Sequence, residues 1–225
     1  MSQLDRRKFL KAACLTAGAG FALPLAVEPS AFASEPPKAP PSTSEQVTII
    51  GPKPGYAPQL GTLTSMMAFM RSQVTASTKG MSPADLDFLL DAKANTIGAL
   101  LMHLAATETF YQLHTFDGLE WGKFPDAVNK KFGDAAELGD AGRKNIKGHD
   151  LAFYDAELKA TRAKTLAEFK KRDDKWLFAV DEKWPWGPTN NYCKWFHVTE
   201  HEANHNGQIK LLKARLPGAK KDSGG

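Results

Sequence analysis

Residues 195–209 read Trp-Phe-His-Val-Thr-Glu-His-Glu-Ala-Asn-His-Asn-Gly-Gln-Ile, which places three of the chain's six histidines four residues apart. Residues four apart lie on one face of a helix, with their Cβ atoms about 6 Å from each other. The apolar stripe of the predicted helix runs through Val198, Ile209 and Leu212, and it includes His201 and His205. Imidazoles on a buried stripe are costly without a partner, and a shared metal ion would satisfy both.

One straight helix cannot offer all three histidines to a single ion. His197 and His205 are eight residues apart, which is about 12 Å along the helix axis. The third ligand must therefore come from another helix, and His103 lies on an apolar helical face between Leu100 and Leu104. The spacing alone leaves two interpretations open, a metal site or hydrogen-bonded core histidines. The remaining two histidines are predicted to lie at the surface: His114 and His149.

Helical spacing of apolar residues dominates the rest of the chain. A first helix starts near residue 58 and ends before Gly80. Ser82-Pro83-Ala84-Asp85 predicts the start of a second helix that continues to His114. A third helix is expected over about 140–163, and Thr165 to Glu168 reads as a capping box that starts a shorter helix. Asn190 or Asn191 is expected to cap the last helix, which ends at Leu216.

A long connection separates the second and third predicted helices. Residues 116–139 are broken by glycines and are expected to be irregular, which suits a crossover between parallel helices. The sequence therefore predicts an all-α fold: a four-helix bundle with a long crossover between helices 2 and 3 and an extra shorter helix before the last helix. The bundle is expected to span residues 58–217 as one domain, followed by a flexible tail, 218–225.

The N-terminus has the pattern of an export signal. Arg6-Arg7-Lys8-Phe9-Leu10 resembles the twin-arginine signal, and Ala31-Phe32-Ala33 is a small-x-small cleavage site. The apolar run 12–27 is shorter than the ~20 residues of a membrane-spanning helix, so stable membrane insertion is not expected. We therefore expect a twin-arginine signal peptide over 1–33, the twin-arginine translocase as a partner, and a periplasmic or otherwise exported location. A proline-rich tether, 34–57, should follow.

Charge and cysteine content narrow the classes of partner. The formal net charge of +4 is small for 225 residues and gives no indication of nucleic acid as a partner. Cys193 is the only cysteine after the signal, so an internal disulfide is excluded. A homodimer is compatible with a helical bundle, although no interface stripe stands out.

The segment His201-x-x-x-His205-Asn206-Gly207-Gln208-Ile209 resembles the signature of the DinB-like (DinB/YfiT-type) metal-binding four-helix-bundle superfamily. In that superfamily one histidine comes from the second helix, and His103 matches this element in position and context. The resemblance covers most of residues 58–217. It implies a three-histidine metal site, His103, His201 and His205, for a divalent ion such as zinc, nickel, iron or manganese. Asn206 departs from the pattern, because an arginine is more usual there.

His197 is an additional histidine, one turn before the pair. It could tune the site from outside or replace one ligand; Gln208, three residues after His205, favours the later pair. Among nearby acids, Glu108 could orient an imidazole or act as a base, while Glu202 is expected on a solvated helix face. An aromatic cluster is expected to pack around the start of the last helix or to roof a pocket: Trp184, Trp186, Tyr192, Trp195 and Phe196.

Characterised members of the superfamily include thiol-dependent transferases and isomerases in which a metal lowers the pKa of a thiol. The resemblance thus implies a metal-dependent hydrolase or thiol-dependent transferase with a small molecule of unidentified structure as substrate, and the N-terminal signal adds that this protein is exported. The alternative is a non-catalytic metal-binding or envelope-stress bundle protein, and a third is a bundle in which the histidines are only structural. Whether the chain is an enzyme stays open at the level of sequence.

Overall fold

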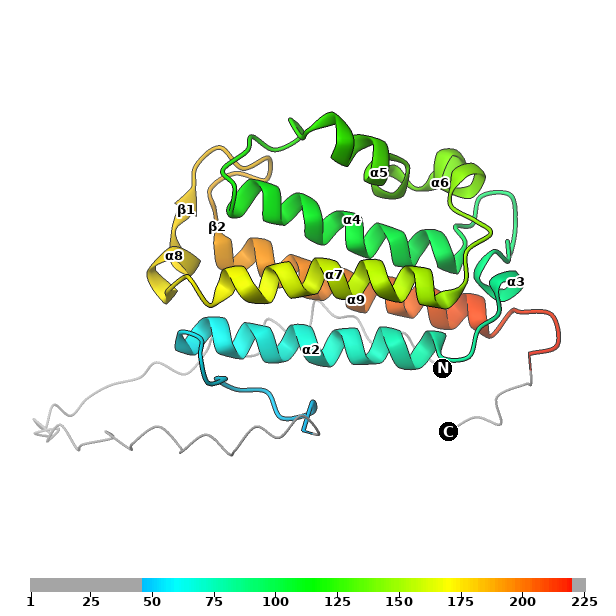
Figure 1. Cartoon of the computed structure of the whole chain (residues 1–225), viewed down its shortest axis with the longest axis horizontal. Coiled ribbons are helices and arrows are strands. Elements are labelled where there is room, and N and C mark those ends of the chain that lie inside the picture. Colours follow the sequence, from blue (N-terminus) through cyan, green and yellow to red (C-terminus); the bar gives the residue numbers. More distant parts are fainter. Residues whose placement is uncertain (1–45, 220–225) are drawn as a thin grey trace, which may run out of the picture. The chain divides into compact units, whose positions relative to one another are not determined.

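Four long helices dominate the computed structural model, which describes residues 46–219. The predicted signal peptide and residues 34–45 of the tether lie outside the described residues. In chain order the elements are α2 (Pro58–Thr78), α3 (Pro83–Leu86), α4 (Ile97–Thr115), α5 (Asp126–Glu137), α6 (Gly139–Asn145), α7 (Leu151–Phe169), α8 (Asp174–Phe178), β1 (Val180–Asp181), β2 (Thr189–Asn190) and α9 (Asn191–Lys213) (Figure 1). The predicted all-α fold class is confirmed for this part of the chain.

Helices α4 and α9 run antiparallel. Trp195 Nε1, near the start of α9, donates to Thr115 Oγ1 at the end of α4 over 3.2 Å. Further along α9, His201 lies against His103, near the start of α4. This register places the four-residue histidine spacing of α9 directly opposite α4.

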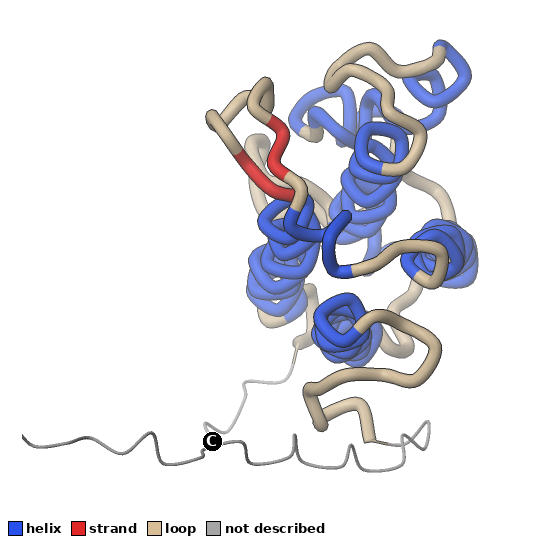
Figure 2. Tube along the Cα trace, turned by 90° about the vertical axis from the view of Figure 1, so that its left-hand side faces the viewer, coloured by secondary structure: helices blue, strands red, loops and turns tan. Residues whose placement is uncertain are grey.

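Helices α4 and α7 run parallel. Gly98, at the start of α4, adjoins Tyr154 at the start of α7, while Gln112 Nε2 donates to Thr165 Oγ1 near the other end. The segment between them is thus a crossover, as predicted, and it carries α5 and α6 along the outer side of α4 (Figure 1). Figure 2 looks along the long helices and shows the crossover on one side of them.

The second predicted helix is interrupted. The expected continuous helix over 83–114 is wrong, because α3 ends at Leu86 and α4 begins only at Ile97. Asp91 Oδ1 accepts the backbone N–H of Lys93 at 2.7 Å, which stabilises a local turn instead of a helix. Thr96 then caps α4, since its side chain accepts the N–H three residues later.

The crossover and the third helix also differ from expectation. Residues 126–137, predicted to be irregular, form the amphipathic α5, which packs Phe132 and Ala135 on α4. The expected helix over 140–163 is divided between α6 and α7 at Gly148, whose φ of 79° favours glycine.

Thr165 does not begin a helix. It lies inside α7, fully buried, and its hydroxyl donates to Glu108 over 2.6 Å. The extra short helix is present further on as α8, and it leads into a two-stranded antiparallel hairpin that the sequence did not predict, with Val180 opposite Asn190. Asn190 caps α9 as expected, accepting the N–H of Cys193 at 2.8 Å.

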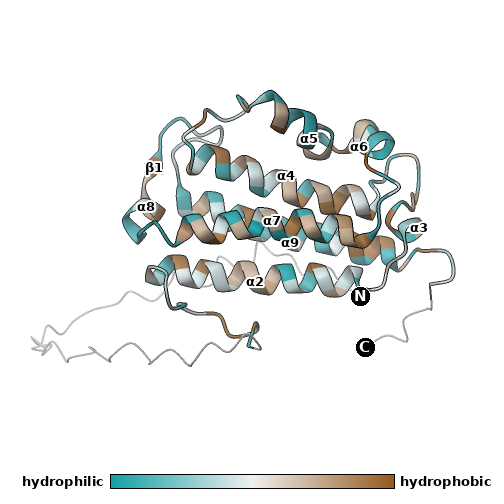
Figure 3. Cartoon of the chain, viewed as in Figure 1, coloured by the Kyte–Doolittle hydropathy of each residue, from teal (hydrophilic) through white to brown (hydrophobic). Residues whose placement is uncertain are grey.

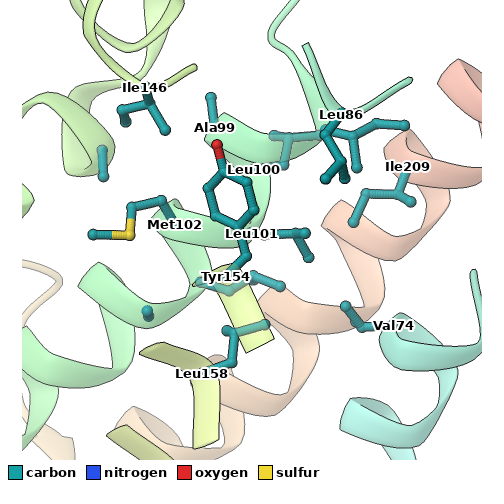
Figure 4. Packing of buried hydrophobic residues seen from close by; sticks show 14 of the residues in the cluster. Val74, Leu86, Ala99, Leu100, Leu101, Met102, Ile146, Tyr154, Leu158 and Ile209 are labelled. Atoms are coloured by element: carbon teal, nitrogen blue, oxygen red, sulfur yellow. The ribbon is translucent and has the colours of Figure 1, made fainter. Parts of the chain in front are cut away.

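The bundle has two cores. One is aliphatic and lies between α4, α7 and α9, with Leu100, Leu158 and Ile209 buried together (Figure 4). A Cβ on Gly98 would lie 2.5 Å from the Tyr154 hydroxyl, so this close approach of α4 and α7 requires glycine. The other core is aromatic and surrounds Trp195. Figure 3 shows hydrophobic residues distributed along the four long helices, while α5 is mostly hydrophilic.

The last residues of the expected tether contact the bundle. The Gly51 N–H donates to Ser65 Oγ on α2 over 3.0 Å, and Tyr56 packs against the aromatic core. Within residues 46–219, no helix combines the length and the apolar character that membrane crossing requires.

A buried cluster of four charged side chains joins all four long helices. Each helix supplies one residue: Arg71 from α2, Glu108 from α4, Arg162 from α7 and Glu202 from α9. Glu202 is 2% exposed, so its predicted place on a solvated face is wrong. Burial alone would raise the pKa of Glu108, but the positive charges of Arg162 and Arg71 outweigh it and lower that pKa.

Geometry in this cluster is tight. Arg162 Nε lies 2.7 Å from Glu108 Oε1, and its Nη2 lies 2.6 Å from Glu202 Oε1. Arg71 contacts the same two carboxylates, at 3.0 Å for Glu108 and 2.5 Å for Glu202. Two positive and two negative charges therefore balance, which removes the cost of an unpaired buried ion.

Arg162→Met should lower the free energy of unfolding by about 3–5 kcal/mol, because it leaves two buried carboxylates with a single arginine. The matched control is Lys164→Met on the same helix, where an exposed pair with Asp117 at 3.3 Å should contribute less than about 1 kcal/mol. Urea unfolding of both variants measures the difference. Equal losses in the two variants would contradict this role for the cluster.

Candidate metal centre

Three histidines from two helices meet between α4 and α9. His201 Nε2 lies 2.7 Å from His103 Nε2 and 3.1 Å from His205 Nε2. The ligand atoms of all three side chains lie within 4.8 Å of one another. The structure thus brings together the three residues that the sequence analysis selected as ligands.

The orientation of His103 is set by the crossover. Its Nδ1 lies 2.7 Å from the carbonyl oxygen of Ala135, in the last turn of α5. The last carbonyls of a helix lack partners within it, so this oxygen is free to accept the N–H of an imidazole. A proton on Nδ1 leaves the lone pair on Nε2, which faces the other two histidines.

Burial keeps this group of histidines neutral. Burial and, to a smaller extent, repulsion from the neighbouring imidazoles together lower the pKa of His201 to about 3 and that of His205 to about 4. Burial also lowers the pKa of His103, against the effect of its bond to Ala135. Neutral imidazole is the form that binds metal, so the three side chains are ready ligands at neutral pH.

Hydrogen bonds alone satisfy this arrangement poorly. His205 Nδ1 is buried and has no hydrogen-bond partner among the described residues. His201 Nε2 lies between the Nε2 atoms of His103 and His205. If it carries a proton, it can donate that proton to His103 or to His205, but not to both at once. A divalent cation would accept all three nitrogen lone pairs, and three imidazoles leave coordination positions free. The residues present therefore fit a metal ion.

His197 is placed outside this group of three. Its Nδ1 lies 3.0 Å from the Tyr111 hydroxyl, and the Trp186 ring packs against it with ring centroids 5.0 Å apart. Its ring centroid is 5.2 Å from that of His201. Burial lowers the pKa of His197 as well. The residue thus forms a wall beside the centre, one helical turn away from the nearest candidate ligand.

His114 is not a surface residue, contrary to expectation. Its side chain is only 16% exposed, and its Nε2 lies 3.0 Å from both Asp181 Oδ2 and Lys194 Nζ. The bond from Lys194 to Asp181 lowers the pKa of this carboxyl to about 2. These contacts tie the hairpin to α4 and α9. His149 stacks on Phe153, away from the other histidines.

The predicted aromatic cluster divides into two parts. Trp195 and Trp184 are buried and belong to the aromatic core, as ordinary packing requires. Trp186 is 57% exposed and stands beside His197, while Phe196 points to solvent. Of these two exposed residues, Trp186 packs against His197 beside the candidate metal centre. Its place on the hairpin could not be deduced from helical spacing.

Comparisons with known proteins identify a family and a fold for this chain. The model of a family described as Mycothiol-S-transferase matches residues 62–218. No curated protein matches the chain. A crystal structure of a conserved protein from Enterococcus faecalis is similar at 14% identity and a TM-score of 0.52, covering 68% of this chain and 93% of that one. An uncharacterized protein from Clostridium difficile 630 is similar at 14% identity and 0.53, covering 70% and 97%. Both likenesses show the fold alone.

Replacing any one of the three clustered histidines by alanine should reduce bound metal from about one ion per chain to a small fraction, because two imidazoles rarely hold a divalent ion tightly. His149→Ala and His197→Ala are the matched controls and should keep most of the metal. Elemental analysis of the purified proteins measures the content. Full metal content in a His201→Ala/His205→Ala double variant would contradict the assignment.

The metal-free protein should begin to lose stability at a pH above the range in which carboxylates take up protons. The folded-state pKa values of His201 and His205 lie below the ordinary 6.5, so the unfolded chain binds more protons between the two values. The free energy of unfolding should then fall as pH decreases from 6.5 to 5, by up to about 1.4 kcal/mol per pH unit for each histidine. Urea unfolding across this range should give a smaller slope for His201→Gln; an unchanged slope would refute the explanation.

Proposed function

Because the chain belongs to the mycothiol S-transferase family, we propose that it is a metal-dependent transferase that activates a small thiol for attack on an electrophile. We propose His103, His201 and His205 as the ligands of one divalent ion: zinc, nickel, iron or manganese. The observation that carries the proposal is the convergence of three neutral Nε2 atoms within hydrogen-bond distance. The family name supplies the thiol, and the geometry supplies a place where it could bind.

A bound divalent ion would supply a positive charge that lowers the pKa of a thiol. The overall reaction is a substitution at carbon. The thiol loses its proton, its sulfur forms a bond to the electrophilic carbon, and the leaving group departs with the electron pair. The chain's part is to hold the three nitrogens in place and to limit water around them.

Side chains beside the centre would position the reactants. The Thr107 hydroxyl lies 3.4 Å from His201 Nε2, close enough to contact a group bound between the histidines. Tyr111 is 2% exposed, and burial keeps its hydroxyl protonated by raising its pKa. Its bond to His197 fixes that imidazole next to the site. Trp186 offers an exposed indole on the same side.

Two other functions share the same site. The open coordination positions would also suit water, and the protein would then be a hydrolase; the family match favours the thiol. A metal-binding bundle without a reaction is the alternative that the experiment below separates. A small-molecule substrate is part of the proposal for the transferase and for the hydrolase. A homodimer would be compatible with these two functions and with the non-catalytic bundle.

We also propose that the protein is exported through the twin-arginine translocase to the periplasm or beyond. The support is Arg6-Arg7 followed by Phe9-Leu10, with the cleavage site at Ala31-Phe32-Ala33. This route carries folded proteins, so a metal could be loaded before export. Small thiols are concentrated in the cytoplasm, and the proposed location therefore requires a thiol supply outside it.

Mature protein loaded with zinc, nickel, iron or manganese in turn should conjugate a small thiol, such as mycothiol or cysteine, to 1-chloro-2,4-dinitrobenzene. The rate should fall by about 100-fold or more in His201→Ala, because a metal ion contributes several kcal/mol to such steps. His149→Ala is the control and should retain the rate. Stoichiometric metal without conjugation of any thiol tested would favour the non-catalytic alternative and sink the transferase proposal.

A further inference from the structure

A cavity lies along the seam between α2 and α7, away from the three clustered histidines. Its volume is about 550 Å³, within the range of small-molecule sites. Its lining comes from α2, from the end of α7 and from Lys53 in the segment before α2. None of the clustered histidines belongs to it, because they lie on α4 and α9.

Every charged side chain that lines this cavity is cationic: Lys53, Arg71, Lys79 and Arg162. The two arginines are neutralised by Glu108 and Glu202, which they contact from the inner side. The two lysines have no such counter-charge in the lining, so the cavity carries a net positive charge. A positive cavity with no acidic lining favours an anion.

Each of the two arginines also donates a hydrogen bond to a backbone carbonyl of the other helix. Arg71 Nη1 on α2 donates to the carbonyl oxygen of Leu158 on α7 over 2.9 Å. Arg162 Nη1 on α7 donates to that of Met67 on α2 over 3.0 Å. Both Nη1 atoms thus lie between the two helices, at the floor of the cavity.

Each guanidinium has a donor to spare. A guanidinium carries about five N–H groups, and Arg71 makes four hydrogen bonds to protein groups. Arg162 likewise makes four. In both residues Nη2 and Nε are fully engaged by carboxylates, so the remaining N–H is on Nη1. Two donors at the floor of the seam therefore lack an acceptor in the described part of the chain.

A third polar group in the cavity also lacks a hydrogen-bond partner in the part of the chain that the structure describes. Thr64 is 4% exposed and lines the cavity, and its buried Oγ1 has no hydrogen-bond partner among the described residues. A buried hydroxyl without a partner is unfavourable, and a ligand that pairs with it would remove this cost. Between these polar groups the wall is apolar, formed in part by Ala68 and Leu166.

We propose that this cavity binds a small organic anion with an apolar body, of which a free medium-chain alkyl carboxylate is the simplest form. The carboxylate accepts the spare Nη1 donors of Arg71 and Arg162, and Lys53 and Lys79 attract it electrostatically. The alkyl chain lies against Ala68 and Leu166. The ligand site is independent of the metal centre and of the reaction proposed for it.

Titration calorimetry of octanoate into the mature, metal-loaded protein tests this site. Octanoate should bind saturably at one molecule per chain, at least about tenfold more tightly than octanol, which lacks the charge, and than sulfate, which lacks the apolar body. Octylamine should not bind. Equal binding of octanol or of sulfate would overturn the proposal, as would the absence of saturable octanoate binding.

Variants locate the binding. Lys53→Glu/Lys79→Glu should weaken octanoate binding at least about tenfold, and Ala68→Phe, which fills the cavity, should abolish it with thermal unfolding unchanged. The control Lys130→Glu/Lys144→Glu makes the same change in charge on α5 and α6 and should bind normally. His201→Ala should also bind normally, since the carboxylate does not ligate the metal. Octanoate binding that survives the Ala68→Phe change, or that is lost in His201→Ala, would refute the location.

Discussion

The charge balance between two arginines and two glutamates at the centre of the bundle is the constraint on which the other contacts depend. Each long helix contributes one charged side chain, and all four are at most 14% exposed. Withdrawing any one helix would leave a buried charge without its partner, at a cost larger than most single contacts can offset. The four helices therefore associate as one unit, although they pack around two separate apolar cores.

This cluster also fixes the register that builds the histidine centre. Glu108 lies just over one turn after His103 on α4, and Glu202 is the residue after His201 on α9. Because both carboxylates bind the same arginines, α4 and α9 cannot slide along each other without breaking ion pairs. The antiparallel register that joins the carboxylates also sets His103 opposite His201 and His205. The buried cluster of four charged side chains, which has no part in the proposed reaction, thus positions the histidines that would carry the chemistry.

Local patterns in the sequence were sufficient to predict the helices whose residues follow the usual spacing and capping rules. The spacing of His201 and His205 on an apolar stripe, with Asn190 as cap, correctly predicted α9 and the place of its histidines. The match to a family of the DinB-like superfamily agrees with the resemblance read from the same residues. Two predictions were wrong because the side chain concerned serves a distant partner. Thr165 resembled a helix cap but donates to Glu108, and Glu202 resembled a surface residue because its arginines lie on other helices.

The link between His103 and the carbonyl of Ala135 has a consequence for the motions of the protein. Helix α5 belongs to the crossover and contributes no residue to the ion-pair cluster that joins the four long helices, so a detachment of α5 would leave that cluster intact. Each detachment would free the His103 ring to turn. A metal ion bound to the His103 ring would in turn oppose the detachment of α5. The amide hydrogens of α5 would then exchange with solvent more slowly in the metal-bound protein than in the metal-free protein. The crossover would thereby report the occupancy of a centre to which it contributes no metal-binding side chain.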